Sequence, residues 1–334
     1  MLRLPTFTYR QPTSLREAFA MKADAGPEGS YVAGGTDLYP NMKRRQQEPK
    51  VVVSLMGIAE LAETRTAERG TEVGASVTLS ALSADPAIRL TAYHAVAEAA
   101  ELVSTPLLRN MGTLGGNLCI DTRCNYYDQS YEWRKAIDFC MKKDGAICWV
   151  APSSPRCWAV SSSDVAPVMV AIGAEYVLTS AAGERVVPAA RFYQNDGINY
   201  LTKQPDEILT AVRLPASDGW DAVYHKLRRR GSFDFPVLGV AAWVRWEGGQ
   251  AADARVVLGG VASHPLEVPE AGTALRGSRL EPEAIGAAAE AAFRPAKPMD
   301  NTDFDLSWRK QMTRVYVTRA LEELRSRKTA VVTK

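Results

Sequence analysis

Two glycine-rich segments constrain the fold of this chain more than any other feature of its sequence. One runs from Tyr31 to Leu38 and the other from Arg109 to Cys119. Glycine has no Cβ atom, so the backbone at these places can take positive φ values and approach another group closely. Successive N–H groups of such a loop can point toward one anion, for example a phosphate. Each segment alone is equally compatible with an ordinary connection between a strand and a turn.

Neither segment matches the two best-known nucleotide-binding patterns. A dinucleotide fingerprint requires the spacing G-x-G-x-x-G, and a Walker A loop ends in Gly-Lys followed by Ser or Thr. Both segments instead carry an adjacent glycine pair, Gly34 with Gly35 and Gly115 with Gly116. Phosphate binding at these loops would therefore use a different geometry.

The apolar pattern predicts strands and helices in blocks rather than in strict alternation. A capping box at Ser14 and Glu17 predicts a helix that ends near Gly26. Further helices are expected over 91–103 and 306–326, and a β-hairpin over 175–187. Other strands are expected at 31–33, 51–55, 71–75, 208–214, 223–227, 240–246 and 254–258. This arrangement favours an α+β fold over a doubly wound sheet.

Length and charge exclude some classes of function. A chain of 334 residues corresponds to two or three domains. With 40 basic and 38 acidic residues, the net charge of +2 gives no reason to expect a nucleic acid or an anionic membrane as a partner. The longest apolar stretch, 165–174, is too short to cross a bilayer. The first residues contain no apolar leader, so we expect a cytoplasmic protein without a membrane anchor.

Four of the five cysteines fall within one short segment. Cys124, Cys140, Cys148 and Cys157 are separated by 15, 7 and 8 residues. In a reducing compartment such a group is more consistent with a metal site than with disulfides. An iron–sulfur cluster fits this loop-like spacing, whereas structural zinc usually takes ligand pairs two to four residues apart. Cys119, just ahead of the group, is expected to be a small buried hydrophobe.

Several motifs in a fixed order make the chain resemble a known family. The segment 33–38 is followed by Thr113-Leu-Gly-Gly-Asn-Leu118, by Ser163-Asp-Val-Ala-Pro167 and by 208–215. In this it is similar to the flavoprotein subunit or domain of the xanthine dehydrogenase and carbon monoxide dehydrogenase family. The resemblance covers most of the chain and implies two domains. A two-part FAD-binding domain would span 1–217, with two α/β subdomains meeting near residue 57, and an α+β carboxy-terminal domain would span 220–334.

The resemblance also implies which residues contact FAD. The backbone amides of both glycine segments would bind the diphosphate and ribityl region. Asp164 would lie near the cofactor and Lys226 would line its site, although Asp164 is equally compatible with a helix cap and Lys226 with a solvated charge. The implied FAD-binding residues are Tyr31, Val32, Ala33, Gly34, Gly35, Thr36, Asp37, Leu38, Val103, Ser104, Thr113, Leu114, Gly115, Gly116, Asn117, Asp164, Leu209 and Lys226.

An insertion distinguishes this chain from the general family pattern. In that pattern the Gly-Gly-Asn loop is followed after a few residues by the Ser-Asp motif, but here 45 residues lie between Asn117 and Ser163. The insertion, 122–162, contains the four clustered cysteines and seven aromatic residues. In its position it resembles the flavin subunit of the 4-hydroxybenzoyl-CoA reductase branch, which carries an extra 4Fe-4S cluster. That resemblance implies Cys124, Cys140, Cys148 and Cys157 as the cluster ligands.

The same resemblance implies an electron-transfer subunit. The complete enzyme would add a subunit with the molybdenum cofactor and a subunit with 2Fe-2S clusters, as a dimer of heterotrimers. Reduced ferredoxin would supply electrons for reductive removal of the phenolic hydroxyl, yielding benzoyl-CoA. The basic residues of the insertion are candidates for docking ferredoxin and equally for ordinary solvated charges; they are Arg134, Lys135, Lys142, Lys143 and Arg156.

Two other interpretations remain open from the sequence. The chain could be the flavin subunit of a carbon monoxide dehydrogenase or aldehyde oxidoreductase, with an insertion that only stabilises an interface. It could also be a zinc-stapled binding protein without flavin. We expect no catalytic residue in this chain, since no nucleophile and base are suitably spaced. The three histidines, His94, His225 and His264, show no spacing typical of a metal site or a triad.

Overall fold

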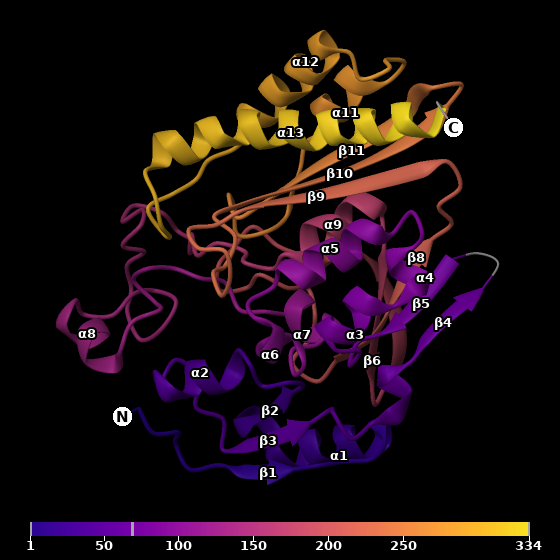
Figure 1. Cartoon of the computed structure of the whole chain (residues 1–334). Coiled ribbons are helices and arrows are strands. Elements are labelled where there is room, and N and C mark those ends of the chain that lie inside the picture. Colours follow the sequence, from indigo (N-terminus) through magenta and orange to yellow (C-terminus); the bar gives the residue numbers. More distant parts are fainter. Residues whose placement is uncertain (1, 68–69, 333–334) are drawn as a thin grey trace.

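The computed structural model describes residues 2–67 and 70–332, which form three sheets flanked by helices (Figure 1). The first sheet is parallel, with strand order β1-β3-β2. Helix α1 contacts β2 and β3, and the short helix α2 follows β2. The elements of this part are β1 (Thr8–Arg10), α1 (Leu15–Ala25), β2 (Gly29–Val32), α2 (Leu38–Lys43) and β3 (Val51–Ser54), with 3-10 turns at Gly26–Glu28 and Ala59–Ala62.

The second sheet is antiparallel, with strand order β4-β5-β8-β6-β7. Its strands are β4 (Thr64–Ala67), β5 (Gly70–Gly74), β6 (Glu175–Ser180), β7 (Gly183–Pro188) and β8 (Ile208–Pro215). The helices of this part are α3 (Leu79–Ala84), α4 (Pro86–Arg89), α5 (His94–Leu102), α6 (Pro106–Arg109), α7 (Leu114–Leu118), α9 (Val165–Ile172) and α10 (Ala189–Phe192). Every residue of α9 is buried, because it lies in the middle of the molecule.

The third sheet is also antiparallel and is covered on both faces. Its strands are β9 (Trp220–Leu227), β10 (Leu238–Glu247), β11 (Gln250–Gly259) and β12 (Leu266–Glu267); its helices are α11 (Pro269–Leu275), α12 (Pro282–Phe293) and α13 (Leu306–Val332). Side chains alternate along a strand, so Ala241 and Trp243 of β10 join the core that contains α5 and α9, whereas Val240 and Val244 pack toward α11–α13. Burial on both faces explains the nearly continuous apolar run of β10.

The cysteine-containing insertion leaves and rejoins the body through one pair of residues. Arg123 and Val160 form an antiparallel bridge, with N–H···O distances of 2.8 and 2.7 Å between their backbones. Between them the chain forms a lobe, 124–159, that protrudes beside α2 and includes α8 (Tyr131–Ala136) (Figure 1). A helix in this lobe was not predicted from the sequence.

Most expected elements are present, with shifted ends. Ser14 caps α1 by accepting the Glu17 N–H at 3.3 Å, but the Glu17 carboxylate accepts from Thr13 rather than from Ser14. The helix expected from residue 91 begins only at His94. Strand β1 was missed because it is short and pairs with the distant strand β3. Strand β4 was also missed, although it pairs with its neighbour in the sequence, β5.

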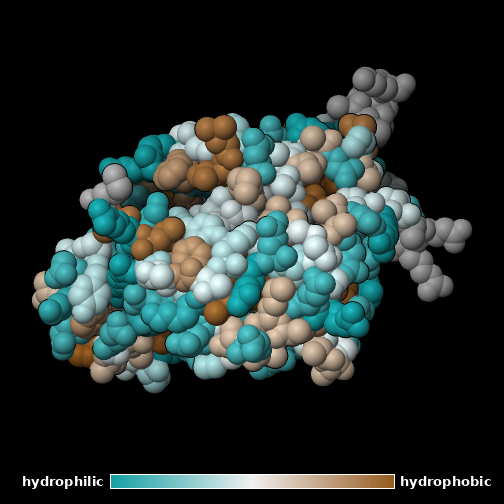
Figure 2. Space-filling view, turned by 90° about the horizontal axis from the view of Figure 1, so that it is seen from below, coloured by the Kyte–Doolittle hydropathy of each residue, from teal (hydrophilic) through white to brown (hydrophobic). Residues whose placement is uncertain are grey.

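None of the described helices combines the length and the apolar character needed to cross a membrane. On the face seen from below, hydrophobic residues lie in separate small groups among hydrophilic ones (Figure 2).

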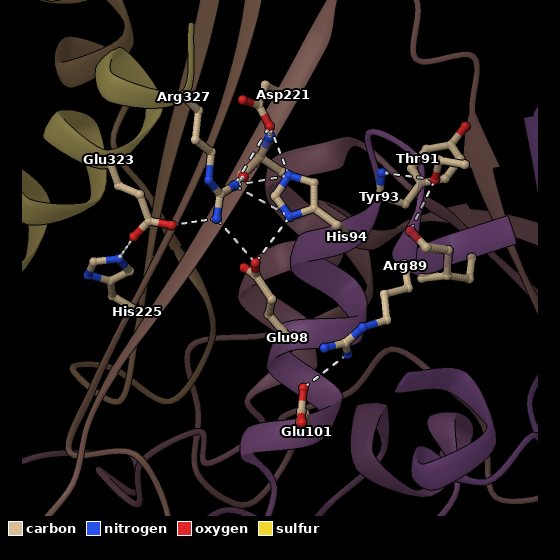
Figure 3. A network of polar contacts seen from close by, with 12 residues as sticks. Arg89, Thr91, Tyr93, His94, Glu98, Glu101, Asp221, His225, Glu323 and Arg327 are labelled. Carbon is tan, nitrogen blue, oxygen red and sulfur yellow. Dashed lines mark hydrogen bonds and ion pairs between the residues drawn. The ribbon is translucent and has the colours of Figure 1, made fainter. Parts of the chain in front are cut away.

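A network of ion pairs joins α5, β9 and α13 (Figure 3). The His94 ring lies 2.8 Å from Asp221 and 3.2 Å from Glu98. Arg327 of α13 reaches the same Glu98 at 3.2 Å, and His225 pairs with Glu323 at 2.7 Å. Burial opposes a charge on His94, but the hydrogen bonds from its ring to Asp221 and Glu98 prevail and raise its pKa from 6.5 to about 9. Two of the three histidines thus stabilise contacts between elements.

We predict that His94→Gln destabilises the protein in a pH-dependent manner. Because the folded pKa of His94 lies above the unfolded value, its contribution is fully present below pH 6.5 and disappears as the pH rises through about 9. Chemical denaturation should therefore show that the free energy of unfolding of the variant is lower than that of the unaltered protein by about 1–2 kcal/mol at pH 6 and is almost the same at pH 9.5. Glu101→Gln, in an exposed pair with Arg89, is the control and should change little. An equal loss at both pH values would contradict this assignment.

Candidate functional site

A cleft of about 640 Å³ separates the first sheet from the second. Its size falls in the range of small-molecule and cofactor sites. Most residues that the sequence assigned to FAD line this cleft, and they come from both sides of it. They are Tyr31, Val32, Ala33, Gly34, Gly35, Thr36, Asp37, Leu38, Val103, Ser104, Thr113, Gly115, Gly116, Asn117 and Leu209.

The two glycine segments touch each other backbone to backbone at one end of the cleft. A Cβ atom added to Gly34 would lie 1.7 Å from the carbonyl oxygen of Met111. No side chain fits in such a space, so glycine is required there. This contact places the first loop directly beside the second, although they are about 75 residues apart in the sequence.

The backbone N–H groups of the two loops differ in availability. In the described part of the chain, those of Gly34, Gly35 and Thr36 have no protein acceptor. Those of Gly115 and Gly116 are already used: the first donates to Ala75 O at 2.8 Å and the second to Thr113 Oγ1 at 3.1 Å. Only the first loop therefore presents a run of free donors of the kind that binds a phosphate. The second loop supplies a surface without side chains.

Three predicted residues lie outside the cleft lining. Leu114 is fully buried in the core. Asp164 and Lys226 form an ion pair of 2.8 Å, with 3% and 1% of their side chains exposed, behind the cleft wall. The alternative of a solvated Lys226 is wrong, because its side chain is buried. Asp164 stands at the N-cap position of α9, but its side chain makes no capping hydrogen bond; Ser163 Oγ accepts the Ala166 N–H at 2.9 Å instead.

The Asp164–Lys226 pair supports a strained corner of the cleft. Lys226 Nζ donates to the carbonyl of Leu102 at 3.0 Å, next to the cleft residues Val103 and Ser104. Ser104 has a φ of 48°, which is unusual for a residue with a side chain. Burial raises the pKa of Asp164 and lowers that of Lys226, and the opposite charge of each partner counteracts both shifts. The pair thus positions this corner from behind.

The sequence missed cleft residues that no motif marks. Ile120 and Asp121 follow the second loop directly, so their proximity to it was the only available signal. Tyr200, Lys203 and neighbouring residues up to Ile208 reach the cleft from the loop before β8, and Phe235 reaches it from the loop before β10. Cys119 also lines the cleft, and burial raises the pKa of its thiol to about 11, so it is neutral.

The four clustered cysteines converge in the lobe. Cys124, Cys140, Cys148 and Cys157 are all buried and line one small cavity together with Tyr127 and Lys142. The thiol of Cys157 forms a hydrogen bond with that of Cys148, which lowers the pKa of Cys148 to about 5 and raises the pKa of Cys157. Among the described residues, no three or more metal-ligating side chains are arranged around the position of a single ion.

Two of the five basic residues considered for ferredoxin docking are buried, so that part of the expectation is wrong. Arg134 is fully buried and donates to the carbonyls of Arg44 and Arg45 at 2.9 and 3.1 Å, which anchors the lobe to α2. Lys142 points inward, with 6% of its side chain exposed. Lys135 is exposed, and Lys143 and Arg156 are partly exposed.

Comparison with known proteins decides the family. Residues 5–217 match the FAD-binding domain in molybdopterin dehydrogenase, and residues 222–324 match the C-terminal domain of the CO dehydrogenase flavoprotein. This chain belongs to the molybdopterin dehydrogenase flavoprotein family.

Relatives match over nearly the whole chain. The carbon monoxide dehydrogenase medium chain of Afipia carboxidovorans is 29% identical over 325 residues, covering 96% of this chain and 98% of the relative. The aldehyde oxidoreductase FAD-binding subunit PaoB of Escherichia coli is 30% identical over 280 residues, covering 80% of this chain and 85% of that subunit. In a solved structure of reconstituted CO dehydrogenase from Oligotropha carboxidovorans, one chain superposes with a TM-score of 0.80 at 27% identity, covering 97% of this chain and 99% of that one.

Family membership confirms the expected fold, a two-part FAD-binding domain followed by an α+β carboxy-terminal domain. The interpretation as a zinc-stapled protein without flavin is wrong, because it required glycine loops that carry no flavin. The cleft fits FAD, since it combines a suitable volume with free N–H groups and a largely apolar lining.

We predict that Gly34→Ala abolishes FAD binding by this flavoprotein. The added methyl group would overlap Met111 O, so the two loops must separate and the free N–H groups of the first loop would move. Released flavin in the purified variant should fall more than tenfold, as measured by absorbance after denaturation. Gly286→Ala, on α12 where nothing lies within 4 Å of the new atom, is the control and should retain full flavin content. A Gly34→Ala protein with normal flavin would refute this account of the loops.

Proposed function

We propose that this chain is the electron-transfer subunit of a 4-hydroxybenzoyl-CoA reductase and carries FAD and a 4Fe-4S cluster. It would pass electrons from reduced ferredoxin toward 2Fe-2S clusters and a molybdenum site on partner subunits. The single observation that carries the proposal is the convergence of four buried cysteines in a lobe inserted beside the flavin cleft. Family membership accounts for FAD only, so the cluster rests on these cysteines.

The spacing of the cysteines favours a cluster over a single zinc ion. Structural zinc usually takes ligand pairs two to four residues apart, whereas 15, 7 and 8 residues separate these cysteines. A cubane holds its thiolates farther apart, because each binds a different iron. Aromatic side chains surround the four thiols: Tyr126, Tyr127 and Trp149 line their cavity. Such a shell excludes water from a cluster.

The partner subunits are inferred from the family. The names of the relatives describe one chain of a larger enzyme, such as a medium chain or a FAD-binding subunit. We propose the same here, as a dimer of heterotrimers with one molybdenum-cofactor subunit and one 2Fe-2S subunit per half. Bound FAD would accept electrons singly or in pairs. The residues of this chain would hold FAD through the free amides of 34–36 and cover it with the second loop.

We predict that Cys140→Ser removes the cluster but leaves FAD in place. The cysteine cavity and the cleft are separate. Loss of one ligand should therefore lower the iron and acid-labile sulfide of this subunit at least severalfold without changing its flavin content. Metal, sulfide and flavin analysis of the purified complex checks this. Ser153→Ala, at an exposed site of the same lobe that lines neither cavity, should retain both cofactors. Stoichiometric zinc, with no more iron and labile sulfide than the 2Fe-2S clusters of the partner subunit account for, would overturn the cluster.

Substrate tests of the same complex separate the two remaining candidates. Formation of benzoyl-CoA from 4-hydroxybenzoyl-CoA with a reduced low-potential donor is the expected activity. Oxidation of carbon monoxide or aldehydes, without the dehydroxylation, would favour the alternative of a carbon monoxide dehydrogenase or aldehyde oxidoreductase.

We propose that ferredoxin docks on the outer surface of the lobe. Exposed apolar side chains gather there, including Trp133, Ile147 and Trp149. Lys135 and Lys143 lie in the same lobe and can attract an acidic donor.

We predict that Lys135→Gln combined with Lys143→Gln slows reduction by ferredoxin about two- to tenfold at low salt and weakens its salt dependence. Stopped-flow reduction of the complex at several ionic strengths measures both. Lys50→Gln, at an exposed site just before β3, should behave like the unaltered complex. An unchanged rate and salt slope in the double variant would exclude this docking surface.

A further inference from the structure

Lys142 is a buried cation between the two proposed cofactor sites. Its ammonium group donates to Asp121 Oδ1 at 2.8 Å, to Thr122 Oγ1 at 2.8 Å and to Gly197 O at 2.5 Å. Its three donors are therefore all used inside the protein. The side chain lines the cavity of the four cysteines and favours the charged form of the Cys157 thiol.

Asp121, the ion-pair partner of Lys142, lines the other cavity. This carboxylate lines the flavin cleft and is only 8% exposed. Its second oxygen, Oδ2, accepts from Tyr127 Oη at 3.2 Å and from Gln47 Nε2 at 3.3 Å. Asp121 lines only the cleft and Lys142 only the cysteine cavity, so the ion pair spans the wall between them.

Two tyrosine rings complete this wall. The Lys142 ammonium lies 4.9 Å from the centre of the Tyr127 ring and 5.4 Å from that of Tyr200. Tyr127 lines the cysteine cavity and Tyr200 lines the cleft. Both rings exclude water, and charges in a dry environment act on their neighbours more strongly than solvated ones do.

We infer that the Lys142–Asp121 pair sets the difference between the reduction potentials of the two centres, with its positive end toward the cluster and its negative end toward the flavin. This inference rests on the proposed function, because it needs both cofactors. Reduction adds negative charge to a centre, so Lys142 favours the reduced cluster and Asp121 disfavours the reduced flavin. Together they make the difference between the reduction potentials of the cluster and the flavin smaller. Electrons that pass from the cluster to the flavin thus lose little of their reducing power.

The test is a redox titration of the purified complex, with the cluster followed by EPR and the flavin by absorbance. Lys142→Met should lower the equilibrium constant for cluster reduction about tenfold, which is about 59 mV for a one-electron couple. Asp121→Asn removes a negative charge beside the flavin and should raise the equilibrium constant for flavin reduction by a similar factor. Lys142→Arg retains the charge and should change the equilibrium constant for cluster reduction less than threefold.

Lys143→Met is the matched control, because this lysine is the next residue but is 34% exposed and solvent screens its charge. Equal shifts in Lys142→Met and Lys143→Met, or no shift in either, would overturn the inference. If the Lys142→Met complex loses the iron of the cluster, the flavin reduction potential of Asp121→Asn is the test. An unchanged flavin potential in that variant overturns the inference. The EPR signal of the 4Fe-4S cluster and the flavin content are measured first, because the 2Fe-2S clusters of the partner subunit also supply iron and sulfide. Absence of that signal or of flavin from the unaltered complex refutes the proposed function, whereas both present with unshifted potentials refute only the role of the pair.

Discussion

The close approach of Gly34 to the carbonyl of Met111 is the contact on which the site depends. It joins the loop after β2 of the first sheet to the loop between α6 and α7, and it is possible only because position 34 has no Cβ atom. With the loops held together, the N–H groups of 34–36 stay free of protein acceptors and face the cleft. The first loop is also tied to the lobe, because Asp37 pairs with Arg123, whose guanidinium stacks on Phe235. The cleft and the lobe are therefore positioned by the same group of residues.

The lobe is accommodated because the chain segments on either side of it contact each other directly. The Arg123–Val160 bridge pairs its two ends, and Asn117 accepts from Ser163 Oγ at 2.7 Å and from the Val165 N–H at 3.3 Å. The second glycine loop and the start of α9 are therefore in direct contact, although the lobe lies between them in the sequence. The family fold, shared with carbon monoxide dehydrogenase, thus accommodates a lobe that contains four buried cysteines. The additional segment lies against the cleft, where it gains a wall of Tyr127, Tyr200 and the Lys142–Asp121 pair.

Charged residues illustrate the limit of sequence reasoning. Lys142 and Lys143 are adjacent and identical in type, yet one is buried in an ion pair and the other lies near the surface. Asp164 and Lys226, which the family resemblance places near the cofactor, pair with each other, and Lys226 holds the Leu102–Ser104 corner of the cleft. In each case the outcome depends on which distant group meets the side chain, and local pattern carries no information about that. His94 is similar, since its carboxylate partner Asp221 is 127 residues away.

The sequence by itself determined the local elements and the order of motifs. Apolar runs marked β9–β11, a capping residue marked α1, the glycine pairs marked both loops, and four close cysteines marked the lobe, because each of these signals depends on neighbours along the chain. Tertiary structure alone decided that both faces of the third sheet are buried, that the amides of 34–36 are free while those of 115–116 are used, and that Asp121 and Lys142 stand between two cavities. These features arise from long-range packing and from burial of charge, which are properties of the folded arrangement rather than of any segment.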